Sequence, residues 1–483
     1  MSINYDAYET VVGLEVHAQL LTQSKLFCGD STAFGSEPNT HVSPITLAHP
    51  GTLPKMNKKA IELAIKMGLA CHSEIVKENY FARKNYFYPD LPKGYQLSQH
   101  TTPICKNGYI TIKIKDSEKE IRLNRIHIEE DAGKSLHDVD EKYSSVDFNR
   151  AGVPLIEIVS EPDIRSGEEA YVYLSELRKL VRYLEICDGN MEEGSLRCDA
   201  NISVRKKGDA RLGTKAEIKN LNSIRHVKRA IEFESKRMIG MLEEGLELTQ
   251  QTRGLDADSG ITFSIRDKED ADDYRYFPDP DLTKFFLTDE FIQTVHKTIP
   301  ALQQERIKKY TTQYQLSEYD ASVLTEEKKF SDYFEEIIKS GTKFKSAANW
   351  MLGPVKSWLN DNNAEIDQFP LGPQKIAALI QMIEEGKLSF SIASTRVFNE
   401  LIKNPGATPI ELAKERNWLQ DSNADAIENL IDQVLNKFPE KVNEYKKGKK
   451  GLIGLFVGEV MKLSKGTADP KMTNDILSQK LKS

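Results

Sequence analysis

The sequence contains little cysteine. Its five cysteines among 483 residues are odd in number, and none of them forms a Cys-x-x-Cys pair. A scattered, odd set supports neither a disulfide framework nor a zinc knuckle. We therefore expect free, buried thiols.

Long apolar runs are also lacking. No stretch of about 18 apolar residues occurs, so no membrane span is expected. The first residues, Met1-Ser-Ile-Asn-Tyr-Asp6, are polar and acidic, whereas a signal peptide needs a basic start and an apolar segment. With 39% hydrophobic and 29% charged residues, the composition is that of a soluble globular protein, and a cytoplasmic location is expected.

A standard phosphate-binding loop is missing. No Gly-x-Gly-x-x-Gly occurs, and Gly133-Lys134-Ser135 resembles only the end of a P-loop, because Ile128 stands where the first glycine belongs. If the protein binds a nucleotide, we expect another arrangement to hold it.

Charge of one sign does not dominate the chain. The net charge of −7 argues weakly against a protein that coats nucleic acid. Residues 441–483, however, hold ten Lys and four acidic residues. The run Tyr445-Lys-Lys-Gly-Lys-Lys450 lies just before Gly454 and Gly458. It is compatible with a solvated loop or with close approach of a phosphate backbone.

The residue patterns indicate an α+β fold with a large mixed or antiparallel sheet. Thr111–Lys115 and Asn201–Arg205 alternate polar and apolar residues, as half-buried strands do. One helix is predicted from Ser166, with Glu169 in a capping box, and another from near Asn222.

Beyond residues 298–300 the period changes to that of a helix. Stripes at Ile376 to Ile383 and Ile427 to Val434 predict two amphipathic helices. The Pro/Gly-rich segment 404–409 is a strong breaker. We predict three domains: a sheet-rich domain at 1–293, a helical domain at 294–405 and a small helical tail at 406–483.

Glu and His alternate in two predicted strands. Glu15 with His17, and His127 with Glu129, have the i, i+2 spacing that places both side chains on one face of a strand. The expected metal ligands are Glu15, His17 and Glu129, with Glu217 as a further one. Carboxylate oxygens with one imidazole favour Mg²⁺ or Mn²⁺ over Zn²⁺. A solvated strand face is the alternative.

Three other segments are open to two interpretations each. Lys84 and Lys93 lie in an aromatic-rich segment, either lining a cavity or forming a packed surface loop. Tyr274 and Arg275 suit stacking on a base or a structural turn. A third set alternates along one strand and faces either a pocket or water: Arg197, Asp199 and Asn201.

Long stretches of the chain closely resemble the family of B subunits of bacterial tRNA-dependent amidotransferases. The stretches that carry the resemblance are Val12-Gly-Leu-Glu-Val-His17, Phe34-Gly-Ser-Glu-Pro-Asn-Thr40, Arg83-Lys-Asn-Tyr-Phe-Tyr-Pro-Asp90, His127-Ile-Glu-Glu-Asp-Ala-Gly-Lys134, Pro154-Leu-Ile-Glu-Ile-Val-Ser-Glu-Pro-Asp163, Glu192-Glu-Gly-Ser-Leu-Arg-Cys-Asp-Ala-Asn201, Lys215-Ala-Glu-Ile-Lys-Asn-Leu-Asn-Ser223, Tyr274-Arg-Tyr-Phe-Pro278 and Gly454-Leu-Phe-Val-Gly458. They are long and specific and cover essentially the whole chain.

The resemblance implies a cradle domain, a helical domain and a YqeY-like tail domain that binds misacylated tRNA. It implies a carbon–nitrogen ligase that uses ATP and Mg²⁺ to phosphorylate the side-chain carboxylate of Glu-tRNA(Gln) or Asp-tRNA(Asn). Ammonia then displaces the phosphate. The ammonia would come from the amidase of the complex, its A subunit, in a heterotrimer completed by a small C subunit, with no role for a membrane.

The resemblance also implies roles for individual residues. Glu130 and Lys93 would lie at the mouth of an ammonia tunnel, and Lys84 would be a further catalytic residue. The implied metal ligands are Glu15, His17, Glu129 and Glu217. The implied nucleotide-binding residues are Arg197, Asp199, Asn201, Tyr274 and Arg275.

One departure from the family pattern concerns zinc. A branch of the family carries a four-cysteine zinc site, but here only Cys28 remains, with Asp30, Ser43 and Thr46 in the other places. Zinc is therefore not expected, and we predict that packing alone holds this loop.

Two other functions remain open from the residues: a non-catalytic tRNA-binding adaptor, which would not need an acidic metal cluster, and a metal-dependent hydrolase. The sequence does not indicate whether Glu-tRNA, Asp-tRNA or both are substrates.

Overall fold

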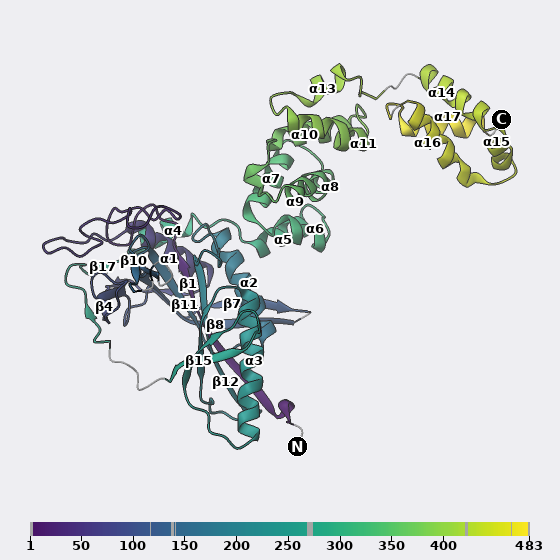
Figure 1. The fold of residues 1–483 in the computed structure, drawn as a ribbon. Helices are drawn as coiled ribbons and strands as arrows, with labels where there is room; N and C mark the ends of the chain where they lie inside the picture. Colours follow the sequence, from purple (N-terminus) through teal and green to yellow (C-terminus); the bar gives the residue numbers. More distant parts are fainter. Residues whose placement is uncertain are drawn as a thin grey trace. The chain divides into compact units, whose positions relative to one another are not determined.

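The computed structural model describes residues 3–115, 117–136, 140, 142–267, 274–420, 424–464 and 466–481 (Figure 1). The chain divides into two compact units, Met1–Leu302 and Gln303–Ser483. The first is built around a large sheet and the second is helical. The α+β fold predicted from the sequence is thus confirmed.

A mixed sheet forms the body of the first unit. In spatial order its strands are β15 (Thr262–Asp267), β14 (Gln251–Leu255), β13 (Ala216–Leu221), β12 (Leu196–Lys206), β1 (Tyr8–Gln19), β11 (Pro154–Ser160), β8 (Ser117–Glu130), β6 (Cys105–Lys106) and β2 (Glu74–Ile75), with β7 (Tyr109–Ile114) also paired to β8. Strands β13 and β14 run parallel, and the other neighbours are antiparallel. The first strand in the chain therefore lies in the interior of the sheet.

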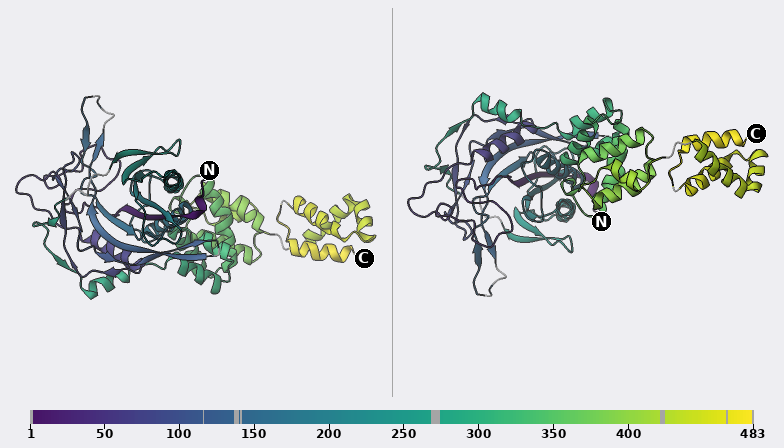
Figure 2. Two further views of the ribbon diagram at one scale, coloured as in Figure 1. Left: turned by 90° about the horizontal axis from the view of Figure 1, so that it is seen from below. Right: turned by 90° about the horizontal axis from the view of Figure 1, so that it is seen from above.

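Helices cover one face of this sheet. The helical elements of the unit are η1 (Tyr5–Ala7), α1 (Lys58–Ala70), α2 (Gly167–Tyr183), α3 (Ile224–Glu243) and α4 (Asp289–His296). Helices α2 and α3 pack on each other and on β7 and β12, and Figure 2 shows them nearly end-on beside the curved sheet. Alternate residues of β1, among them Val12, Leu14 and Val16, are fully buried in the core beneath the helices. The residues between them point to the opposite face.

Both helices predicted in this unit are present. Ser166 caps α2 and its hydroxyl accepts a hydrogen bond from the Glu169 amide, as expected. The Glu169 carboxylate instead accepts a hydrogen bond from the Arg165 amide and pairs with Lys119. Helix α1 was not predicted, although its apolar residues recur with a helical period at Ala60-Ile61, Ala64-Ile65 and Met67-Gly68.

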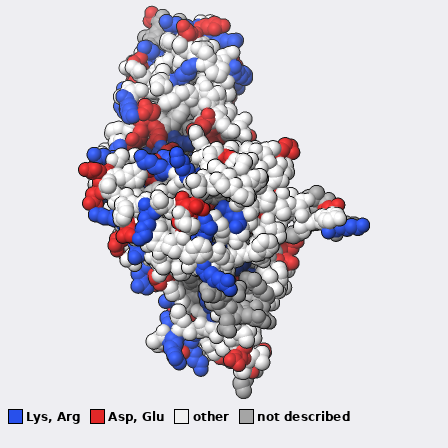
Figure 3. All heavy atoms as spheres, turned by 90° about the vertical axis from the view of Figure 1, so that its left-hand side faces the viewer, with Lys and Arg blue, Asp and Glu red and all other residues white. Residues whose placement is uncertain are grey.

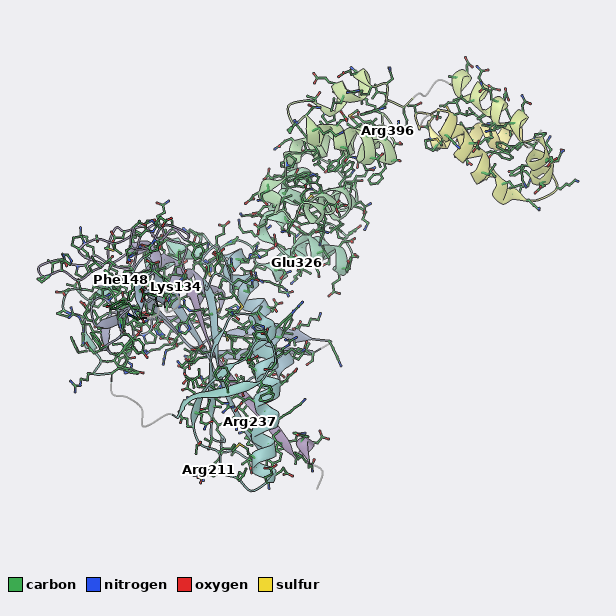
Figure 4. All side chains as sticks on the ribbon, in the orientation of Figure 1. Lys134, Phe148, Arg211, Arg237, Glu326 and Arg396 are labelled. Atoms are coloured by element: carbon green, nitrogen blue, oxygen red, sulfur yellow. The ribbon has the colours of Figure 1, made fainter. Side chains whose placement is uncertain are left out.

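Three small sheets flank the main one. They are β16 (Phe277–Pro278) with β4 (Ala82–Asn85) and β5 (Tyr95–Ser98), β9 (Lys134–Leu136) with β10 (Ser145–Asp147), and β3 (Glu78–Asn79) with β17 (Phe285–Phe286). The aromatic-rich segment forms the β4–β5 hairpin, whose loop holds Pro89 and Pro92. Figure 4 labels Lys134, the first residue of β9, and Phe148, which directly follows β10.

Helices make up the described part of the second unit. They are α5 (Gln303–Thr312), α6 (Glu318–Leu324), α7 (Lys328–Lys339), α8 (Phe344–Trp350), η2 (Met351–Val355), α9 (Lys356–Asp361), η3 (Ile366–Gln368), α10 (Pro373–Glu384), α11 (Phe390–Ile392), η4 (Ala393–Val397), α12 (Phe398–Lys403), α13 (Pro409–Glu415), α14 (Ala424–Lys437), α15 (Pro439–Lys446), η5 (Lys450–Leu452), α16 (Ile453–Leu463) and α17 (Pro470–Lys480). The two predicted helical stripes lie on α10 and α14. Segments η2 and η4 are π-helical.

Two separate hydrophobic cores hold this unit. One includes residues from Tyr310 to Ala413, and the other includes residues from Ile427 to Leu481. Helix α13 contributes Leu412 and Ala413 to the first of these cores. The first hydrophobic core therefore continues past the Pro/Gly-rich segment 404–409, where the sequence suggested a domain boundary.

None of the described helices is both long and apolar enough to cross a membrane. On the face drawn in Figure 3, Lys and Arg are interspersed with Asp and Glu. This mixture agrees with the modest net charge of −7.

Candidate active site

The face of the main sheet opposite α2 and α3 is polar around β1. In the strand register, His17 lies opposite Glu157 of β11 on one side and Arg197 of β12 on the other. Glu157 in turn lies opposite His127 of β8. Because residues paired across antiparallel strands point to the same face, these side chains converge from neighbouring strands.

Two imidazoles and two carboxylates alternate at this point. The Nε2 atom of His17 lies 3.6 Å from Glu129 Oε1 and 3.5 Å from Glu157 Oε2. The Nε2 atom of His127 lies 3.5 Å from Glu129 Oε2 and 3.3 Å from Glu157 Oε2. We call these four residues the His–Glu cluster.

The His–Glu cluster has the geometry of a metal site. Ligand atoms of His17, Glu129 and Glu157 all lie within 4.8 Å of one another. The separations across the cluster are close to those between neighbouring ligands around a cation with bonds of about 2.1 Å. Carboxylates and imidazoles together are the ligands that Mn²⁺ and, with more oxygen, Mg²⁺ accept.

The carboxylates of the cluster favour a proton on His17. Burial lowers the pKa of His17, but hydrogen bonding to Glu157 and the charges of Glu157 and Glu129 raise it to about 9. Burial raises the pKa of Glu157, but the two histidines lower it well below its usual range. A divalent cation would replace the proton on His17 as the partner of both carboxylates.

Glu15 and Glu217 lie on the same polar face, beyond the His–Glu cluster. Glu15 accepts a hydrogen bond of 2.9 Å from Asn201 Nδ2, and burial raises its pKa. Glu217 lies 3.1 Å from Lys219 Nζ, which is also 3.7 Å from Asp199. The structure thus brings His17 and Glu129 together with Glu157, and places Glu15 and Glu217 beside an amide and a lysine respectively.

Arg197 is engaged by a neighbouring acid. Its guanidinium forms two hydrogen bonds of 3.0 Å to the carboxylate of Asp131, which also accepts one of 2.7 Å from Gln19. Burial raises the pKa of Asp131, but Arg197 and Arg150 hold it below its usual value. Arg197 therefore presents a fixed positive charge at the edge of the site.

Lys93 and Glu130 form a buried ion pair on the other side of β8. Because successive side chains of a strand alternate, Glu130 points away from Glu129. Lys93 Nζ lies 2.5 Å from Glu130, and the two side chains are 6% and 1% exposed. The Leu97 amide also donates to Glu130, and Lys93 Nζ lies 4.2 Å from the centre of the Phe27 ring.

Lys84 and Tyr274 meet at the small sheet. Lys84 Nζ lies 4.9 Å from the centre of the Tyr274 ring and 5.6 Å from that of Tyr86. The Arg275 carbonyl accepts a hydrogen bond from Asn85, and its backbone has a positive φ of 44°. Burial raises the pKa of Tyr86 well above its usual value, and the nearby site carboxylates raise it further.

Hydrogen bonds, and not packing alone, hold the loop that carries Cys28, Asp30, Ser43 and Thr46. Asp30 accepts bonds from the Ser43 amide at 2.9 Å, from the Thr46 hydroxyl and from the Cys28 thiol at 3.4 Å. These bonds hold the pKa of Asp30 below its usual value although burial opposes them. The prediction that packing alone holds the loop is therefore wrong, because a carboxylate joins all four positions.

Removing the Asp30 carboxylate is expected to destabilise the protein. In Asp30→Ala the Ser43 amide and the Thr46 hydroxyl lose their acceptor, and we expect a loss of about 1–3 kcal/mol in the free energy of unfolding. Urea unfolding followed by circular dichroism measures it. Asp289→Ala, which removes an exposed acid paired with Lys77, is the control. Equal stability of both variants would contradict this account.

Glu157 and His127 were not assigned to a site from the sequence. Glu157 interrupts an apolar strand, Leu155-Ile-Glu-Ile-Val159, and a single charge in such a strand is the signal that was available. His127 was noted only for its spacing to Glu129. Its side chain is 5% exposed, so it is directed into the protein and not into solvent.

Comparison with known proteins gives matches along nearly the whole chain. Residues 10–293 match a family model described as the GatB/GatE catalytic domain, and residues 332–481 match one described as the GatB domain. A protein of Thermodesulfovibrio yellowstonii, named as the B subunit of an aspartyl/glutamyl-tRNA(Asn/Gln) amidotransferase, is 49% identical over 98% of this chain and 99% of its own length. Proteins of the same name from a Thermoanaerobacter species (48% identical) and from Trichlorobacter lovleyi (49%) cover the same shares.

Proposed function

This chain belongs to the GatB/GatE family of amidotransferase B subunits, and from that premise we propose that it activates the side-chain carboxylate of a tRNA-linked glutamate or aspartate for amidation. In this proposal it is a carbon–nitrogen ligase. A partner amidase, held in the complex with a third small protein, would supply ammonia from glutamine.

The His–Glu cluster is the observation that carries the proposal. A carboxylate resists attack by ammonia because oxide is a poor leaving group, whereas phosphate leaves readily from an acyl phosphate. Transfer of a phosphoryl group needs positioning and neutralised charge more than covalent help. A bound ATP with a divalent cation would supply the phosphoryl group and that neutralisation.

We propose that His17, Glu129 and Glu157 hold the cation, with His127 completing the set. Glu15 and Glu217, the other ligands expected from the family, would reach it through water or complete an outer layer of oxygen ligands. Glu15 and Asn201 also line a cavity of about 260 Å³ on the same sheet. We propose that this cavity takes part of the nucleotide, together with Arg197 and Asp199.

The opposite side of β8 suits the handling of ammonia. The Lys93–Glu130 pair is buried between β8 and the β4–β5 hairpin, close to the aromatic ring of Phe27. We propose that Glu130 takes a proton from incoming ammonium while Lys93 keeps the carboxylate charged. Lys84, with Tyr274 and Arg275, would border the path of the aminoacyl group.

The proposal is tested with the complete enzyme. The complex is incubated with ATP, Mg²⁺, glutamine and misacylated tRNA, and the tRNA-linked product is analysed after deacylation. Amide that forms only with ATP supports the proposal. A metal-dependent hydrolase would release the amino acid without ATP, and an adaptor would show no loss of amide when the His–Glu cluster is altered.

Deleting residues 421–483 is expected to weaken tRNA binding. These residues include the Lys-rich run, and their removal leaves the first helical core with α13 intact. We expect at least about a tenfold loss of affinity and a shallower salt dependence, because fewer phosphates are neutralised. Filter binding over a series of salt concentrations measures both, with ATP hydrolysis without tRNA as the control. Unchanged affinity would refute the assignment of the tail.

A further inference from the structure

A cleft in the second unit has no part in the function proposed above. It has a volume of about 610 Å³, and its walls come from two stretches of chain, Leu352–Asp361 and Ser394–Asn399. Ligand clefts in proteins commonly have volumes of about 300–1,000 Å³. The cleft lies at the surface of the helices whose core spans Tyr310 to Ala413.

Both walls of the cleft are built on π-helical turns. Segment η2 joins α8 to α9, and η4 joins α11 to α12, each as a single wide turn inside a longer helix. In the described residues these are the only two π-helical segments. Figure 4 labels Arg396, which lies on η4. Such turns are rare and occur frequently at functional sites, so finding both at one cleft points to a ligand.

The local sequence explains why each turn is π-helical. It does not explain why both turns line the same cleft. Pro354 lies inside η2 and lacks the amide that a regular helix needs. In η4 the Thr395 hydroxyl donates to the Ser391 carbonyl at 2.6 Å, a bond that bends helices. Two separate causes therefore widen two helices toward the same space.

The cleft offers a cation without an acidic partner. Lys356 is half-buried, and no ion pair or hydrogen bond of its side chain occurs among the described residues. Lys219 and Lys328, which are also half-buried, each have an acidic partner. The one acid that lines the cleft, Asp361, accepts a hydrogen bond of 3.5 Å from the Ser357 hydroxyl, and no ion pair between it and Lys356 occurs in the described part of the chain. The lysine charge is therefore left for an anionic ligand such as a phosphate group.

Aromatic and amide groups line the same cleft. Trp358 is half-buried and packs edge-on against Phe369 with ring centres 5.3 Å apart, while Phe398 is buried in the wall. Asn399 donates its amide hydrogen to the Thr395 carbonyl at 2.7 Å, which fixes its carbonyl oxygen. Asn360 is exposed, with no side-chain partner among the residues described.

An aromatic plane, amides and one cation are the groups that recognise an unstacked nucleotide: the ring stacks on a base, the amides bond to its edge and the lysine meets its phosphate. We propose that this cleft binds one unpaired nucleotide of the tRNA substrate. The proposal rests on the proposed function, because tRNA is the partner that would present such a nucleotide.

Lys356→Ala is expected to weaken binding of tRNA to the complete enzyme by about fivefold and to reduce the slope of log affinity against log salt by about 1. Asn360→Ala with Asn399→Ala is expected to weaken binding without changing the slope, because amides carry no charge. The control is Lys339→Ala, which removes an exposed lysine that pairs with Glu336 on α7. Binding is measured without ATP, so a failure of the phosphorylation step does not affect the result.

Cross-linking gives a second readout that does not depend on the stability of a variant. Wild-type enzyme is irradiated with tRNA carrying 4-thiouridine, and the linked peptides are identified by mass spectrometry. Links to 352–361 or 394–399 support the proposal. Links confined to other segments, or a Lys356→Ala enzyme with the affinity and salt slope of the wild type, overturn it. If wild-type enzyme forms no ATP-dependent amide but still cross-links at the cleft, only the proposed function fails.

Discussion

Replacing Glu157 with glutamine is expected to lower ATP-dependent amidation of misacylated tRNA by at least about a hundredfold. The substitution keeps the shape of the side chain but removes the charge that lies 3.5 Å from His17 and 3.3 Å from His127. A cation in the His–Glu cluster would lose one of its two closest anionic ligands. Amidation is measured with the whole complex, and Mn²⁺ affinity is measured in parallel by electron paramagnetic resonance.

The control for this variant is Glu161→Gln, which changes an acid just beyond the same strand, where it bonds to Asn124 away from the cluster. It is expected to retain wild-type amidation and Mn²⁺ binding. Glutamine hydrolysis by the partner amidase should be partly retained in both variants. Full amidation by Glu157→Gln would rule out the His–Glu cluster as the site of a metal that amidation requires.

The second large effect is expected from Lys93→Met. Methionine has a similar length but leaves the Glu130 carboxylate buried and without its cation, and loss of one partner of a buried pair costs about 3–5 kcal/mol. Urea unfolding measures this loss. Burial already raises the pKa of Glu130, and the loss of Lys93 would raise it further. A carboxyl whose pKa is higher in the folded state binds its proton more tightly when folded, so the deficit should be smaller at pH 5 than at pH 8.

Two further variants separate the charge from the packing. Lys93→Met with Glu130→Gln should recover part of the stability, because no buried charge remains and the Leu97 amide keeps its acceptor. Lys59→Met, which breaks an exposed pair with Glu62, should change the free energy of unfolding by less than about 0.5 kcal/mol. Two results would show that the buried Lys93–Glu130 pair does not cause the loss of stability. One is a loss in the free energy of unfolding of Lys93→Met that does not depend on pH, and the other is no recovery of stability in the double variant.

Local spacing was enough to place part of the candidate site. Glu15 with His17 and His127 with Glu129 lie on the polar face because a strand alternates its side chains, and that rule needs no tertiary information. The order of the strands in the sheet, in contrast, can be known only from tertiary structure. Nothing in the residues of β1 indicates that β11 lies on one side and β12 on the other, so the pairing of His17 with Glu157 could not be derived.

The parts that could not be predicted from the sequence have specific physical reasons. Helix α1 is an exception, because its buried residues, among them Ile61, Ile65 and Met67, recur with a helical period that would have allowed its prediction. The network at Asp30 depends on Ser43 and Thr46, which a turn of the chain brings back to it. The family resemblance implied four metal ligands, but which of them share one cation depends on distances of a few ångströms between strands.

The position of β1 has a consequence for how the protein is made. This strand is synthesised before both of its neighbours, and its second neighbour is complete only when the ribosome has passed Lys206. Until then its apolar side chains have no sheet to join, and the contacts that bring His17 to its acidic partners are long in sequence and slow to form. The nascent first half of the protein should therefore be an unusually strong client for chaperones that bind exposed strands.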